Sequence, residues 1–194
     1  MWYDIVVFGG QQMIYVIRHG RTDWNEDGRL QGGTDIPLNE TGRKQAEEAR
    51  EKYKDIHFDV VFCSPLVRAR ETADIFLKGR GLDITYDDRL KEMYFGEYEG
   101  TYPSERPADC AAEVLFSDPL AYAADRGAET LESLYGRTGE FLEEVALPLH
   151  KEGKSVLIVG HGAMNRSIIT RLKGLPVQEM WDADYRNCQL IKVL

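Results

Sequence analysis

The chain has 194 residues, of which 43% are hydrophobic and 29% are charged, a composition typical of a globular domain with a sizeable core. Its formal net charge of -9 argues against the basic surface that nucleic-acid binding requires. A small anion can still bind such a protein where the local charge opposes the global one.

The cysteines and the first residues bear on where the protein works. Cys63, Cys110 and Cys188 lie far apart, and this odd, sparse set favours free thiols in a reducing compartment. No apolar run is long enough to span a bilayer, and residues 1–8 lack the basic region of a signal peptide. We therefore expect a cytoplasmic protein that does not act at a membrane.

Residues 1–12 admit two interpretations. They could contain an extra strand at 3–8 followed by a glycine joint, or they could be an extension ahead of a functional start at Met13. We expect residues 13–194 to form a single domain, because no repeat, low-complexity tract or linker interrupts them.

Short apolar runs alternate along the chain with amphipathic stretches, and these patterns predict strands and helices respectively. Strands are expected at 13–17, 58–63, 83–87, 155–159 and 189–194. Helices are expected at 39–53, 66–78, 130–147 and 162–173, with short helices and loops over 101–126. The alternation predicts an α/β protein, a three-layer α/β/α sandwich with a mostly parallel central sheet.

Several residues are expected to begin or end these helices. Asn39 or Thr41 can cap the first helix, while Ser64 and Pro65 suit the cap and the first turn of the second. Pro148 is expected to end or kink the third helix, because proline has no N–H to donate.

Chemically active side chains follow four of the predicted strands. Two strands end in the tripeptides Arg18-His19-Gly20 and Gly160-His161-Gly162, and two others lead to Arg68 and Glu92. The carboxyl ends of parallel strands share one edge of a sheet, where ligands bind in α/β proteins. We therefore expect two histidines, two arginines and a carboxylate around one crevice.

This set of side chains suits a phosphoryl group. Arginines present planar forks of donors that match phosphate oxygens, and two arginines beside two histidines disfavour a bound metal cation. A neutral imidazole can attack phosphorus and carry it covalently, while nearby cations stabilise the charge on the group in transfer. Glu92, if its surroundings keep it protonated, could supply the proton to the departing alkoxide.

The same residues also have less specific interpretations. A histidine after a strand is more often a polar turn residue than a nucleophile, and Glu97 or Glu99 could serve as the carboxylate instead of Glu92. Other residues are interpreted as structural or exposed, namely His57, His150, Arg70, the core-type aromatics Tyr94, Phe95 and Tyr98, and Asp35, which suits a turn before Pro37.

Motifs in four regions, in the same order along the chain, resemble those of the histidine phosphatase superfamily, the clan of phosphoglycerate mutases and related acid-type phosphatases. They are RHGRTDWN at 18–25 with QG at 31–32 and DIPL at 35–38, SPLVRARETA at 64–73, LKE at 90–92 with FGEYEG at 95–100, and GHG at 160–162. The resemblance spans nearly the whole chain and implies the phosphoglycerate mutase-like fold.

The resemblance implies a role for each catalytic position. His19 would become the phosphohistidine, while Arg18, Arg68 and His161 would hold the phosphoryl group. Glu92 would donate a proton to the leaving group and later activate the water that attacks the phosphohistidine. Neither a metal nor an organic cofactor is implied.

It also implies a set of substrate-binding positions, namely Asn25, Gln31, Gly32 and Gly162. Arg21 is added to this set because it stands where the family often has glutamate, so it could place positive charge at the crevice mouth or face solvent. The segment 127–130 (GAET) loosely resembles a Gly-Glu-Ser segment that often begins the late helix of the family.

The leading hypothesis is a phosphomonoesterase that acts through His19 on a small phosphorylated metabolite. The alternatives are a 2,3-bisphosphoglycerate-dependent phosphoglycerate mutase, whose relatives tend to be longer, and a non-catalytic module that binds a phosphorylated ligand. We expect region 101–126 to cover the site and set specificity. The crevice fits several substrates, namely sugar phosphates, fructose 2,6-bisphosphate, a cobalamin-precursor phosphate and phosphoglycolate-like acids.

The sequence also leaves the oligomeric state open. A homodimer could form through an edge strand or through the N-terminal extension.

Overall fold

The computed structural model describes residues 13–182 and 185–194. The strand predicted at 3–8 lies outside the described residues. Five strands are found in the described chain, joined in one sheet, and each lies within one residue or two of the predicted bounds. They are β1 (Ile14–Arg18), β2 (Val60–Cys63), β3 (Ile84–Tyr86), β4 (Val156–Gly160) and β5 (Leu190–Lys192).

The sheet has the strand order β3-β2-β4-β1-β5. Strands β1, β2, β3 and β4 run parallel, while β5 pairs antiparallel with β1 at the edge. This confirms the prediction of a mostly parallel sheet. The order places the ends of β1 and β4 side by side at the carboxyl edge, although these strands lie far apart in the sequence.

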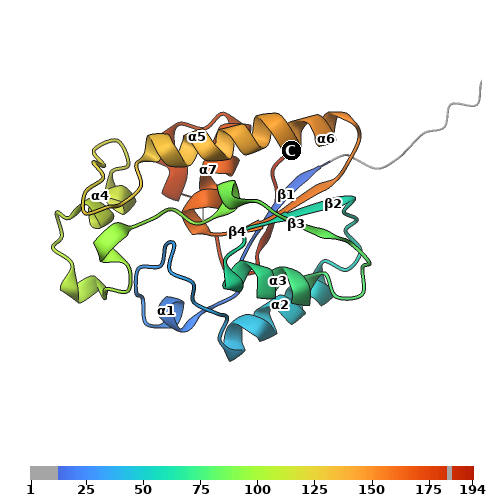
Figure 1. The fold of residues 1–194 in the computed structure, drawn as a ribbon, viewed down its shortest axis with the longest axis horizontal. Helices are drawn as coiled ribbons and strands as arrows, with labels where there is room; N and C mark the ends of the chain where they lie inside the picture. The colour runs from blue at the N-terminus through green and yellow to red at the C-terminus, as the bar shows by residue number, and fades with distance from the viewer. Residues whose placement is uncertain (1–12, 183–184) are drawn as a thin grey trace, which may run out of the picture.

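Helices cover both faces of the sheet (Figure 1). On one face lie α2 (Glu40–Lys52) and α3 (Val67–Phe76), and on the other lie α5 (Leu131–Phe141), α6 (Leu147–Lys151) and α7 (Gly162–Lys173). Because side chains alternate along a strand, the sheet contributes residues to two separate apolar cores, one beneath each helical layer. The predicted α/β/α sandwich is confirmed.

No helix in the described chain is long and apolar enough to cross a membrane. Shorter helical elements lie between the long helices and the strands. They are α1 (Asp23–Glu26), η1 (Asp88–Leu90), η2 (Gly96–Tyr98), η3 (Pro103–Glu105), α4 (Ala111–Ser117), η4 (Leu142–Ala146) and η5 (Val177–Trp181). Both α1 and α4 lie beyond the carboxyl ends of the parallel strands (Figure 1). The prediction of short helices and loops over 101–126 is confirmed.

The predicted cap of the second helix is wrong. Helix α3 begins at Val67 rather than at Pro65, and its cap residue, Leu66, uses no side chain for capping. The N–H of Val67 instead donates to the carboxylate of Asp35 at 2.7 Å. A side chain remote in sequence therefore caps this helix, which leaves Ser64 available for another partner.

Pro148 does not end its helix. Helical backbone continues through α5, η4 and α6 to Lys151, and η4, which precedes the proline, is a wider π-helical turn. Proline lacks the N–H of the ordinary ladder, so a locally wider turn accommodates it without breaking the helix.

Candidate active site

The ends of β1 and β4 bring the two motif histidines together. Arg18 pairs with Gly160 in the parallel register, and the N–H of His19 donates to the Gly160 carbonyl at 2.9 Å. The rings of His19 and His161 consequently lie 5.2 Å apart between centroids. Both histidines are almost fully buried.

Gly20 serves close packing rather than an unusual backbone angle. Its Cα faces the backbone of Gly42 on α2, and a Cβ at either glycine would overlap with backbone atoms of the other segment. The N–H of Gly20 also donates to the hydroxyl of Thr72 on α3 at 2.9 Å. The turn after His19 is therefore held against both helices of that face.

His19 has one ring nitrogen engaged and one available for chemistry. Its Nδ1 lies 2.7 Å from the Gly20 carbonyl, which can only accept, so Nδ1 carries the proton and Nε2 keeps its lone pair. Burial, reinforced by the charges of Arg68 and Arg18, holds the pKa of His19 well below its usual range. The imidazole is therefore neutral at physiological pH and can act as a nucleophile.

His161 is oriented by Ser64. The Ser64 Oγ accepts the N–H of Leu66 at 3.3 Å and lies 2.7 Å from Nε2 of His161. We assign the Ser64 hydroxyl as donor to Nε2, because the hydroxyl then uses both its proton and a lone pair. Nδ1 of His161 is then a buried N–H donor. Burial, followed by the charge of Arg68, also holds the pKa of His161 well below its usual range.

Arg68 is a fully buried cation on α3. Its Nη1 donates to the Thr34 carbonyl at 2.9 Å and its Nη2 to the Gly32 carbonyl at 2.6 Å. Burial lowers the pKa of Arg68 to about 10, opposed by the nearby Glu92 carboxylate, so the guanidinium stays charged at pH 7.

Arg18 supplies the second cation from the end of β1. Its Nη1 donates to the Tyr185 carbonyl at 3.1 Å, and burial lowers its pKa from the usual value. Within the described part of the chain, Nε of Arg18, Nε of Arg68 and Nδ1 of His161 are buried donors without a hydrogen-bond partner. An unmet buried donor costs about 1–3 kcal/mol, and of these three residues Arg18 lines the pocket that holds His19.

Glu92 lies across the site from these cations, on the loop after η1. Its two oxygens accept four backbone N–H bonds, from Met93 at 2.9 Å, Gly162 at 2.8 Å, Ala163 at 3.2 Å and Met164 at 3.0 Å. The last three donors belong to the first turn of α7. The four donors together fix the position of the Glu92 side chain against the start of α7.

The structure distinguishes Glu92 from its two alternatives. Glu97 is exposed and pairs with Arg126, while Glu99 accepts hydrogen bonds from Gly33 and Phe95 and so braces a loop. Glu92 alone of the three lines the pocket that holds His19.

This pocket has a volume of about 300 Å³. Its lining includes the motif residues Arg18, His19, Asn25, Gln31, Glu92 and Gly162, and further residues, namely Arg29, Leu30, Phe95, Phe116, Ala163, Arg166 and Trp181. In residues 13–182 and 185–194, no group of three or more His, Cys, Asp or Glu side chains could hold a metal ion.

Two of the predicted substrate-binding residues do not line the pocket. The Gly32 carbonyl holds Arg68 instead, so this residue acts one step behind the cation. Arg21 is about half exposed and lies 3.9 Å from Glu26, which places its charge at the surface. Asn25, Gln31 and Gly162 do line the pocket, together with Arg18, His19 and Glu92.

Sequence reasoning missed several residues of the site. The sequence interprets Ser64 as a helix cap. It assigns Phe95 to the core, and Phe95 is indeed buried, but it also lines the pocket. Phe116 falls in the region 101–126 that was expected to cover the site. No sequence pattern marks Trp181 or Arg166 for this position.

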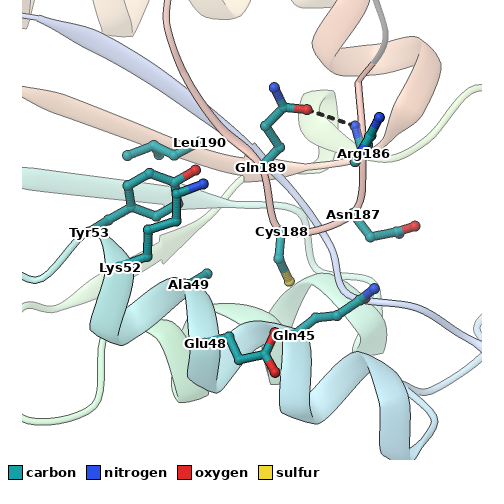
Figure 2. A pocket seen from close by; sticks show the side chains of 10 residues that line it. All are labelled: Gln45, Glu48, Ala49, Lys52, Tyr53, Arg186, Asn187, Cys188, Gln189 and Leu190. Carbon is teal, nitrogen blue, oxygen red and sulfur yellow. Dashed lines mark hydrogen bonds between the residues drawn. The ribbon is translucent and has the colours of Figure 1, made fainter.

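A larger hollow of about 640 Å³ lies between α2 and residues 186–190 (Figure 2). Cys188 points from this loop toward α2, and burial raises the pKa of its thiol to about 12. Such a thiol is a poor nucleophile at neutral pH, and none of the motif histidines or arginines lines the hollow. The smaller pocket at His19 is therefore the candidate active site.

Comparisons with known proteins agree with this geometry. Residues 14–194 match the model of the histidine phosphatase superfamily (branch 1). A Bacillus subtilis protein named uncharacterized phosphatase PhoE is 38% identical over 163 residues, which are 83% of this chain and 77% of the relative. A 2,3-bisphosphoglycerate-dependent phosphoglycerate mutase of Cytophaga hutchinsonii is 30% identical over 89% of this chain and 82% of its own.

The fold comparison agrees as well. The solved structure of Bacillus stearothermophilus YhfR superimposes with a TM-score of 0.81 at 31% identity, covering 92% of this chain and 88% of that one. The motif order, the buried histidine pair and these matches together confirm the predicted family: the chain belongs to the histidine phosphatase superfamily.

Proposed function

We propose that the protein hydrolyses a small phosphate monoester through a phosphohistidine on His19. The observation that carries this proposal is the neutral Nε2 of a buried histidine, together with two nearby arginines whose buried Nε donors have no partner. An anionic phosphoryl group supplies the acceptors that these donors lack, and the arginines can stabilise the charge on its oxygens during transfer.

In the first step, Nε2 of His19 attacks phosphorus and the bond to the leaving oxygen breaks. The N–P bond replaces the P–O bond, and Glu92 delivers a proton to the departing alkoxide. That proton arrives with the substrate, since a phosphate monoester has a second pKa of about 6 and carries a proton in part near neutral pH.

In the second step, water attacks the phosphohistidine. Glu92, now a carboxylate, accepts a proton from that water and the N–P bond breaks. Inorganic phosphate then leaves with that proton, which restores both Glu92 and Nε2. Arg18, Arg68 and Nδ1 of His161 serve both steps, because each step develops charge on the same phosphoryl oxygens.

The test is hydrolysis of p-nitrophenyl phosphate by wild type and by His19→Ala. We expect the variant to lose roughly 10³-fold or more in kcat, as when a covalent nucleophile is removed. His57→Ala is the matched control, because His57 is exposed and pairs with Asp59. A trapped phosphoenzyme should be labile in acid and stable in base. Undiminished activity of His19→Ala would refute the proposal.

A mutase is the second candidate, favoured by the 30% identical relative named as one. It would use the same residues but return the phosphoryl group to a sugar acid. Incubation with 3-phosphoglycerate and 2,3-bisphosphoglycerate separates the two, since appreciable isomerisation with little hydrolysis would favour the mutase. A wild type inactive on a broad substrate panel would instead favour a binding module.

We further propose that the protein works in the cytoplasm, a proposal supported by its three buried and unpaired cysteines. Cell fractionation tests this. A homodimer remains a prediction, and light scattering of the purified chain measures its mass in solution.

A further inference from the structure

The lining of the pocket at His19 includes an aromatic wall, defined as Phe95, Phe116 and Trp181. All three residues line the pocket, and they come from three separate segments of the chain. Phe95 and Phe116 lie 6.2 Å apart between ring centroids, and Phe116 and Trp181 lie 4.8 Å apart with an interplanar angle of 63°. Leu30 and Ala163 add apolar surface to the same pocket.

The wall is held in place from behind. The indole N–H of Trp181 donates to the Leu115 carbonyl at 2.8 Å, which ties η5 to α4. Phe95 is 4% exposed and belongs to the apolar core. Phe116 is the exception, because 38% of it is exposed at the end of α4. When a ligand covers a large ring that is exposed to water, burial of the apolar surface contributes favourable free energy to binding.

The two arginines near the wall are directed at protein rings. The Arg166 guanidinium lies over the rings of Trp181 and Tyr185, at 5.1 and 5.4 Å from their centroids. Arg29 lies over the rings of Tyr102 and Trp24, at 4.5 and 5.6 Å. The Arg166 contact supports Trp181 within the wall, whereas Arg29 contacts rings outside the wall and lies 3.8 Å from the Asp27 carboxylate.

We propose that the leaving group of the substrate carries a flat apolar ring, which lies against Phe116 and Trp181 while the phosphoryl group sits at His19. This inference rests on the proposed phosphatase function and names the class of its substrate. A compact hydrophilic leaving group, such as that of a phosphoglycerate, would leave the aromatic wall exposed to water, so the favourable free energy of burying it would be lost.

The test compares two substrates that differ in the ring and not in the reactivity of the ester. 2-Phenylethyl phosphate and n-propyl phosphate release alcohols of similar acidity, so the breaking P–O bond is equivalent in both. We expect wild type to favour the phenylethyl ester in kcat/KM by about 10- to 100-fold, the range for apolar contacts in a pocket.

Variants locate the preference. Phe116→Ala should lower the ratio of the two kcat/KM values about tenfold. Because Phe116 is partly exposed, we expect this variant to fold. Phe116→Tyr keeps a ring and should retain the ratio. Tyr86→Ala is the control, because Tyr86 is a comparably exposed aromatic residue that does not line the pocket, and it should leave the ratio unchanged.

The outcomes separate the two proposals. Hydrolysis that depends on His19 but shows no ring preference, or a preference that Phe116→Ala leaves intact, overturns the inference and retains the phosphatase. A stronger preference for 2-carboxyethyl phosphate overturns it in favour of an acid held by arginine. No hydrolysis of any ester by wild type overturns the phosphatase itself.

Discussion

The guanidinium of Arg137 holds the carboxylate of Glu129 through two hydrogen bonds, from Nε at 2.8 Å and from Nη2 at 2.9 Å. Both side chains are largely buried. The remaining nitrogen, Nη1, donates to the carbonyls of Arg89 and Lys91 at 2.7 Å each. Arg137 therefore grips the loop immediately before Glu92.

Glu129 binds the same loop on the other side of Glu92, at Tyr94. Its N–H donates to the Tyr94 carbonyl at 2.8 Å, and its carboxylate accepts the N–H of Tyr94 at 3.3 Å. The segment 127–130, whose role the sequence left open, thus works with Arg137 to position Glu92 from both flanks.

Arg137→Ala should therefore impair proton transfer by Glu92. We expect kcat for an alkyl phosphate to fall roughly 10- to 100-fold, with a smaller change in KM, because a misplaced acid fails mainly in the transition state. For p-nitrophenyl phosphate the loss should be smaller, since p-nitrophenolate leaves without a proton. Steady-state kinetics on both esters gives this comparison. Arg171→Ala, which removes an exposed arginine paired with Glu143 elsewhere, is the control. Equal losses on both esters would indicate a purely structural role.

Ser64→Ala should misorient His161. The variant removes the hydroxyl 2.7 Å from Nε2 and leaves a buried ring nitrogen without a partner, at a cost of about 1–3 kcal/mol in the free energy of unfolding. We expect kcat/KM to fall roughly 10- to 100-fold. Urea unfolding and steady-state kinetics measure the two effects. Ser117→Ala, at an exposed serine bonded to its own helix, should change neither. Full activity in Ser64→Ala would show that His161 needs no such partner.

The two buried histidines should make the free protein less stable in mild acid. Their folded pKa values lie below the unfolded value near 6.5, so the unfolded chain binds more protons as the pH falls below about 6.5. The free energy of unfolding should then fall by up to about 1.4 kcal/mol per pH unit for each histidine. Urea midpoints at pH 7.5 and 5.5, in buffer without phosphate, test this. The double variant His19→Gln/His161→Gln should lose less stability over that interval; an equal loss would contradict the assignment.

Inorganic phosphate should stabilise the folded protein. Ligand at 100 times its Kd adds about 2.7 kcal/mol, which raises the Tm of a protein of this size by roughly 5–10 °C. Arg68→Met should abolish most of this rise, because it removes the buried cation of the site. Arg70→Met is the matched control on the same helix, since Arg70 is exposed and lies over Tyr86. Differential scanning calorimetry with and without phosphate decides, and an unchanged rise in Arg68→Met would place the anion elsewhere.

Local patterns predicted most of the fold, because they depend on neighbours in the chain. Apolar runs and capping residues located the strands and the long helices, and the comparisons confirm the α/β class, the family and the histidine phosphatase assignment. The roles of the individual site residues, the single domain at 13–194 and the compartment stay predictions. The predicted cap at Ser64 was wrong because the carboxylate of Asp35, remote in sequence, bonds the first N–H of α3. Helical backbone continues past Pro148 because the helix type changes locally.

The sequence by itself predicted which groups do chemistry, since Arg18, His19, Arg68, Glu92 and His161 stand in motifs whose order can be read directly. Only the tertiary structure decided what surrounds them. Ser64 beside His161, four backbone donors on Glu92, and an aromatic wall drawn from three segments all arise from contacts between residues far apart in the chain. Such contacts leave no periodic signal in the sequence, because they depend on how the layers pack and not on any local spacing.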